Sequence, residues 1–161
     1  MAIEFVEENG TGLSTATSYC SVAEFVQYWE NRGVDYSAET TANVQAWLNR
    51  GTVYIDINYS FFGERTSTTQ ALEFPRANLA GRNLEDVASN IVPDDIKNAT
   101  NELAREAKLS SDLNVNQNVK SKKVGVVSVT YSSGVAPAYP SVTNYLKFYT
   151  MPGNVMDVYR V

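Results

Sequence analysis

The strongest constraint on the fold is a helix start whose local signals are nearly complete. Ser21 and Glu24 form the S-x-x-E pattern of a capping box, in which each side chain accepts a hydrogen bond from a free backbone amide. Cys20 and Phe25 occupy the two positions of a hydrophobic staple. Apolar residues then follow at the spacing of one buried helix face: Val22, Phe25, Val26 and Trp29. The pattern predicts an amphipathic helix over residues 21–32, stopped by a glycine.

A second helix is predicted to begin near Ser37 or Thr41 and to end at about Asn58. Its middle holds Gly51, which costs up to about 1 kcal/mol relative to alanine in a helix. We therefore expect Gly51 to lie against another helix. The residues expected on the buried face are Val44, Trp47, Leu48, Gly51, Ile55 and Asn58.

A third helix is predicted to start at Pro93, with Asp94 and Asp95 in the first turn, where the helix dipole favours carboxylates. Its inward face is narrow and rich in small residues: Ile96, Ala99, Thr100, Leu103, Ala104 and Ala107. A short last helix is expected over residues 141–149. Alternating valines predict a β-strand over residues 123–131, whose partner strand is not evident.

Together these segments predict a mainly α fold: a small bundle of three to four helices with a short β-hairpin or strand insertion and an extended C-terminal tail. A chain of 161 residues is long enough for one domain with a hydrophobic core. No apolar run approaches the roughly 20 residues of a membrane helix, and the acidic N-terminus does not resemble a signal peptide. We expect a helical domain over residues 1–150 and a docking tail over residues 151–161.

Histidine is absent and Cys20 is the single cysteine. These two facts exclude Ser-His and Cys-His nucleophile pairs, zinc sites with histidine, and thiolate zinc clusters. Asp94 and Asp95 are neighbours on a helix, so their side chains diverge by about 100° and suit a helix start better than a catalytic pair. No metal, cofactor or catalytic residue is expected, and a carboxylate-based hydrolase or transferase is the weakest alternative.

The N-terminal 19 residues are predicted to be extended and rich in turns. Their Gly10-Thr11-Gly12 sequence lacks the lysine and the strand-to-helix setting of a phosphate-binding loop. Glu7 and Glu8 are expected to be solvated.

Charge is unevenly distributed along the chain, which has a net charge of -5. Residues 1–60 hold eight acidic and two basic residues, whereas residues 61–161 hold ten acidic and eleven basic residues. A basic footprint for nucleic acid is therefore missing. An aromatic group with two arginines nearby could stack single-stranded bases, although core packing explains it better: Tyr54, Tyr59, Phe61, Phe62 and Phe74, with Arg65 and Arg76.

The basic cluster Lys120, Lys122 and Lys123 leads into the predicted strand. It could face nucleic acid, or it could be a solvated strand end that resists aggregation; both interpretations stay open. The chain ends on an apolar segment that should be covered by its own domain or by a partner's sheet edge. The residues of this candidate docking tail are Val155, Met156, Val158, Tyr159 and Val161.

The order of several motifs resembles that of the small head-tail connector proteins, or adaptors, of tailed bacteriophages, many of which are labelled DnaT-like single-stranded DNA-binding proteins. The resemblance covers about residues 8–150, and every matching block is structural rather than catalytic. The blocks are ENGTG (8–12), TSY (17–19), SVAE (21–24), RGTVYID (50–56), QALEFPR (70–76), IVPDDIKNAT and ELA (91–104), the valine-rich segment 124–131, and YP (139–140). Phe74 stands where such proteins frequently carry tryptophan.

The resemblance implies a homo-oligomeric ring, typically a dodecamer, beneath the portal protein of a virion, made in the host cytoplasm. Such a ring extends the channel through which genomic double-stranded DNA passes and docks the next neck or tail protein, with its C-terminal segment reaching the portal. We expect no membrane contact. Acidic residues such as Glu24, Glu30 and Glu39 would let the channel repel DNA. The alternative is a single-stranded DNA-binding module that uses the aromatic group and the Lys120–Lys123 cluster.

Overall fold

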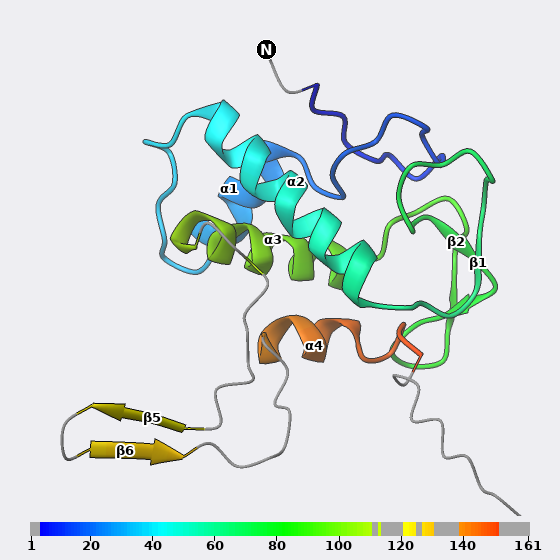
Figure 1. Cartoon of the computed structure of the whole chain (residues 1–161). Coiled ribbons are helices and arrows are strands. Elements are labelled where there is room, and N and C mark those ends of the chain that lie inside the picture. The colour runs from blue at the N-terminus through cyan, green and yellow to red at the C-terminus, as the bar shows by residue number, and fades with distance from the viewer. Residues whose placement is uncertain (1–3, 111–112, 114–120, 125–126, 131–138, 152–161) are drawn as a thin grey trace, which may run out of the picture.

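The computed structural model describes residues 4–110, 113, 121–124, 127–130 and 139–151. This part of the chain holds four α-helices and three two-stranded antiparallel pairs (Figure 1). The helices are α1 (Val22–Glu30), α2 (Thr41–Asn58), α3 (Asp94–Leu109) and α4 (Pro140–Leu146). The strands are β1 (Glu64–Arg65), β2 (Arg76–Ala77), β3 (Leu79–Ala80), β4 (Asp86–Val87), β5 (Ser121–Val124) and β6 (Val127–Thr130). The mainly α class with a short hairpin is confirmed.

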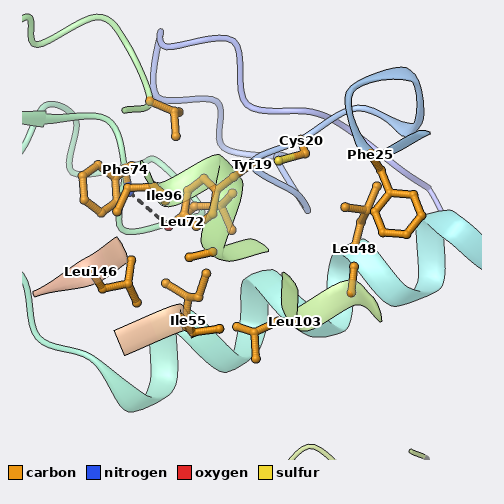
Figure 2. Packing of buried hydrophobic residues seen from close by; sticks show 14 of the residues in the cluster. Tyr19, Cys20, Phe25, Leu48, Ile55, Leu72, Phe74, Ile96, Leu103 and Leu146 are labelled. Carbon is orange, nitrogen blue, oxygen red and sulfur yellow. Dashed lines mark hydrogen bonds between the residues drawn. The ribbon is translucent and has the colours of Figure 1, made fainter. Parts of the chain in front are cut away.

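Helix α3 lies at the centre of the bundle, because it contacts each of the other three helices and packs most extensively against α2 (Figure 1). The predicted role of Gly51 is confirmed: a Cβ atom there would lie 3.0 Å from the carbonyl oxygen of Thr100 and 3.2 Å from the amide nitrogen of Ala104. Figure 2 shows Ile55 of α2 and Leu103 of α3 in this core. The small residues of α3 let the two helix backbones approach closely.

Helix α1 begins as its sequence predicts. The Ser21 side chain accepts from the Glu24 amide, and the Glu24 side chain accepts from the Ser21 amide. The helix is shorter than predicted, since it ends at Glu30 rather than at residue 32, and Gly33 then adopts a φ of +76°. Tyr28 was not among the residues predicted on the buried face of this helix. It is buried, and its hydroxyl donates a hydrogen bond to Glu102 of α3.

Helix α2 starts at Thr41 behind its cap Thr40 and ends at Asn58. Most of the predicted stripe is buried, but Asn58 is exposed and Trp47 is half-buried. Asn58 was wrongly assigned because it lies in the last turn, where its side chain can bond back to the Tyr54 carbonyl oxygen at 2.9 Å instead of entering the core.

The single strand predicted over residues 123–131 is wrong, and the missing partner strand is part of the same segment. β5 pairs with β6 in an antiparallel register that sets Val124 opposite Val127. The last helix starts at Pro140 and ends at Leu146, three residues before the predicted end; Tyr149, beyond the end of the helix, is nevertheless buried.

Residues 59–92 connect α2 to α3, and we call them the connecting segment. They form the short pairs β1–β2 and β3–β4 and otherwise follow turns. Phe61 forms an antiparallel bridge with Thr150, which ties this segment to the end of the described chain after α4. Figure 2 shows Leu72 and Phe74 of the segment beside Tyr19 and Leu146.

Candidate interaction surfaces

No catalytic pair is assembled at the start of α3. The Arg82 guanidinium and the Tyr149 hydroxyl each donate a hydrogen bond of 3.2 Å to the Asp95 carboxylate, whereas Asp94 is exposed. In the described ranges no group of three or more Cys, Asp or Glu side chains is arranged to hold a metal ion. None of the described helices is long and apolar enough to cross a bilayer.

The prediction that Glu8 is solvated is wrong, since its residue is only 1% exposed. Its carboxylate accepts hydrogen bonds from the amides of Gly10, Gly12 and Leu13 at 2.8–2.9 Å. The Gly10-Thr11-Gly12 loop therefore binds a carboxylate of its own chain through its backbone amides. The signal was present in the sequence: a glutamate followed two and four residues later by glycines, both of which adopt positive φ angles.

A second buried polar site was not predicted. The Tyr19 hydroxyl donates to Asp56 Oδ1 at 2.5 Å, and the Glu73 amide donates to Asp56 Oδ2 at 3.3 Å. Burial raises the pKa of Asp56 to about 6, against the lowering effect of the Tyr19 hydrogen bond. Burial together with the charge of Asp56 raises the pKa of Tyr19. Asp56 therefore attaches α2 to Glu73 of the connecting segment, 17 residues further along the chain.

The aromatic group is largely core, as the sequence favours. Phe61 and Phe74 are 2% and 0% exposed and meet edge to face, with ring centroids 4.8 Å apart. Tyr54 and Tyr59 are half-buried, and Tyr54 packs edge to face on Tyr139. Phe62 alone of the five is exposed. Four of these rings therefore offer little face for stacking a base.

Each lysine and arginine whose side chain the structure describes has a partner within the chain. Arg65 and Arg76 donate to backbone carbonyls of the connecting segment, and Arg50 donates to the Ala107 and Ser110 carbonyls at the end of α3. The others pair with carboxylates or lie over aromatic rings: Arg32, Arg82, Lys97, Arg105, Lys108 and Lys147. Among the side chains that the structure describes, every lysine and arginine would therefore have to share its present partner with a phosphate.

Two of the acidic residues expected to repel DNA are already neutralised. Glu24 lies 2.6 Å from the Lys97 ammonium, and Glu39 lies 2.5 Å from that of Lys108. Glu30 is exposed at the end of α1. The repulsive effect of this region is thus smaller than its sequence suggests.

The predicted sites at the end of the chain fall mostly outside the described residues. Lys120 and the tail residues Val155, Met156, Val158, Tyr159 and Val161 lie outside them, and Lys122 and Lys123 are placed only as backbone positions of β5. What the structure does describe is the root of the tail. There the Phe62 amide donates to the Tyr149 carbonyl at 2.9 Å, and the Met151 amide donates to the Ser60 carbonyl at 2.8 Å.

Three exposed apolar residues take part in these backbone bonds or lie next to them in the chain: Phe62 (45% exposed), Phe148 (38%) and Met151 (46%). We call these three residues the tail-root patch. Arg82 and Lys147 lie over the Phe148 ring at 5.2 Å and 5.1 Å. Large apolar side chains gathered at one place on a surface are typical of protein contact sites.

No curated protein and no solved structure matches the chain. One family matches over residues 3–161, and its description is "Putative DnaT-like ssDNA binding protein". Since the match spans nearly the whole sequence, the chain belongs to this DnaT-like family.

Proposed function

We propose that this chain is a structural virion protein, a head-tail connector that forms a ring of copies beneath a portal and binds its partners without catalysis. The observation that carries this proposal is the tail-root patch. Phe62, Phe148 and Met151 are exposed at the point from which the apolar residues 152–161 continue. An apolar patch beside an apolar terminal segment suits attachment to another protein.

The test is removal of residues 152–161, which keeps Met151 and its hydrogen bond to Ser60. We expect the truncated protein to retain its circular dichroism spectrum and melting temperature, but to lose co-sedimentation with purified portal rings. As a control, Leu84→Ser alters an exposed apolar residue outside the tail-root patch and should not affect attachment. Full attachment of the truncated protein would refute the tail assignment.

The second candidate function is single-stranded DNA binding, and the family match supports it rather than the connector. Its physical basis would be Lys120, Lys122 and Lys123, since the described cations already have partners within the chain. A segment with three lysines in four residues can track a phosphate backbone. The exposed Phe62 would be the one member of the aromatic group open to a base.

Fluorescence anisotropy with labelled oligonucleotides over a salt series separates the two candidates. A single-stranded DNA-binding module should bind at low salt, weaken steeply as salt rises, and lose affinity when the three lysines are replaced by glutamine. Lys147→Gln is the matched control, because Lys147 already lies over Phe148. A connector should show weak binding that the triple replacement hardly changes.

A further inference from the structure

A polar groove lies between α1 and the first half of α3, with a volume of about 520 Å³. This is within the size range of cavities that take ligands or side chains. Carboxylate, amide and ammonium groups line it beside Ala23 and the ring of Tyr28. The residues that matter here are Glu24, Gln27, Asn31, Asp94, Lys97 and Asn101. A smaller cavity of about 430 Å³ continues past Lys97 and Asp94 to Glu7 and Glu8.

The groove has more negative than positive charge. Lys97 is shared between Glu24, at 2.6 Å, and Glu7, at 3.9 Å. Burial and the nearby charge of Glu24 raise the pKa of Glu7, whereas the hydrogen bond from Lys97 lowers the pKa of Glu24 despite its burial. Asp94 adds an exposed carboxylate. One ammonium therefore faces three carboxylates, so an incoming cation is favoured over an anion.

A buried amide in the wall of the groove also needs a partner. Asn101 is 3% exposed, and its Oδ1 has no hydrogen-bond partner in the part of the chain that the structure describes. Such an orphaned acceptor is costly unless a donor reaches it. The groove thus combines an excess of negative charge with one hydrogen-bond acceptor, Asn101 Oδ1, that has no donor among the described residues.

The chain itself contains a segment with the complementary chemistry. No aspartate or glutamate lies between Asp112 and Asp157, and this stretch holds Lys120, Lys122 and Lys123. Strand β5 carries two of these lysines and pairs only with β6 in its sheet. Figure 1 shows this hairpin apart from the four helices. A two-stranded hairpin is marginally stable alone in water, so it gains from a surface to bind.

We propose that the groove between α1 and α3 receives the lysine-rich segment 120–123 of a second copy of this chain. The inference rests on the proposed function, for which it supplies the contact between copies. The two surfaces are different, so the contact is head-to-tail, and repetition of such a contact builds a ring or a filament. Lysine ammonium groups would meet Asp94, Glu7 and Glu24, and an N–H donor would reach Asn101.

Two variants of the full-length protein test each side of this contact. The donor variant K120Q/K122Q/K123Q removes the positive charge of the segment and leaves the groove intact. The acceptor variant Asp94→Lys reverses an exposed charge in the groove and leaves the segment intact. Glu64→Lys is the control, because it makes the same charge change at an exposed residue of β1 outside the groove. Circular dichroism and melting curves establish that all three fold.

Sedimentation velocity at 50 mM and 500 mM NaCl measures self-association. We expect the wild-type and control proteins to associate at low salt and to weaken at high salt, where charge pairs are screened. Each variant alone should associate at least about tenfold more weakly. An equimolar mixture should form dimers that grow no further, because the mixture contains one intact segment and one intact groove per pair.

Asn101→Leu supplies a second acceptor variant without a change of charge. It should weaken association by about three- to tenfold, since one hydrogen bond is lost, while the melting temperature does not fall. A merely structural role of Asn101 would change the melting temperature and leave association unaltered.

Three results would overturn the inference. Association of both variants at wild-type strength, or failure of their mixture to form dimers, would reject the groove and leave the connector proposal standing. A wild-type protein that stays monomeric at low salt but binds oligonucleotides through its lysines would reject both.

Discussion

Helices α2 and α3 and the connecting segment, residues 59–92, each bury apolar side chains, but they satisfy their backbone groups by different means. Within each helix the backbone amides donate hydrogen bonds to backbone carbonyls of the same helix. The contact between α2 and α3 therefore depends on how closely their surfaces fit, as at Gly51 against Thr100 and Ala104. The connecting segment has only two-residue strands, and it depends on side chains for its remaining hydrogen bonds.

Arg76 is the main example in the connecting segment. It is 8% exposed, and its guanidinium donates to the carbonyl oxygens of Phe61, Phe62 and Gly63 and forms an ion pair with Glu73 at 2.6 Å. One planar side chain with five donors thus replaces part of a sheet. The comparison teaches that the contact between α2 and α3 depends on close fit and should be sensitive to added volume at Gly51, whereas the connecting segment should be sensitive to the loss of side-chain donors.

The largest effect is expected from Arg76→Met, which keeps much of the side-chain length but removes every donor. The carbonyls of Phe61, Phe62, Gly63 and Glu73 and the Glu73 carboxylate would lose this partner in a largely buried place. We expect the free energy of unfolding to fall by about 3–5 kcal/mol, measured by urea denaturation. Arg82→Met is the control, since the Arg82 side chain is 49% exposed and should cost less than about 1 kcal/mol.

Gly51→Val tests the contact between α2 and α3. A branched side chain has no room where a Cβ already approaches the Thr100 carbonyl oxygen at 3.0 Å, so α2 and α3 must separate. We expect a loss of about 2–3 kcal/mol in the free energy of unfolding. Ala42→Val, on an exposed position of the same helix, should change it by less than about 0.5 kcal/mol. Equal effects at both positions would contradict the close contact.

Asp56 links the two regions and makes their attachment pH-dependent. Its pKa is about 6 in the folded protein, above the ordinary value of 3.8, so between those values the folded state binds more protons than the unfolded state. Stability from this group is therefore present below about pH 4 and is lost as pH rises through about 6. The expected loss is on the order of 1–3 kcal/mol.

Urea denaturation of the wild type and of Asp56→Asn from pH 4 to pH 7 measures this difference. The wild type should lose stability relative to the variant as pH rises. The control Asp35→Asn should run nearly parallel to the wild type over this pH range, because hydrogen bonds from Ser37 lower the pKa of Asp35 from its ordinary value of 3.8 and its effect on stability falls mainly below pH 4. Parallel curves for the wild type and Asp56→Asn would mean that the carboxyl titrates normally.

The smallest effect is expected at the start of α1. Ser21→Ala removes the hydroxyl that accepts from the Glu24 amide at 3.1 Å, and should lower the free energy of unfolding by about 1 kcal/mol. Ser60→Ala, at an exposed position before β1, should have almost no effect. A loss at Ser21 as large as that at Arg76 would show that local caps matter here as much as the connecting segment's polar contacts.

The helices could be predicted from the sequence because their signals lie within a few residues of one another. The Ser21–Glu24 box, Thr41 as a start, and Asp94 with Asp95 in a first turn all match the structure. Ends were less certain: α1 and α4 stop two and three residues early. The hairpin of residues 121–130 was taken as one strand, because a run of alternating valines does not show where the chain turns.

The candidate sites divide in the same way. Core packing of Phe61 and Phe74 was favoured from the sequence and is confirmed. The burial of Glu8 was missed, since acidic residues near a terminus are normally solvated. The contact of Tyr19 with Asp56 joins residues 37 positions apart, and no local pattern reveals such a pair. The roles of Lys120, Lys122, Lys123 and the tail stay predictions.

By itself the sequence determined where α1 and α3 begin, that Gly51 needs a close neighbour, and that histidine chemistry is excluded. Those properties depend on residue identity and on contacts within a turn or two of helix. Only the tertiary structure decided which polar groups are buried, how Arg76 satisfies the connecting segment, and that Lys97 of α3 pairs with both Glu24 and Glu7. The physical reason is that a charge is stabilised by whatever surrounds it in space, and those surroundings come from distant parts of the chain.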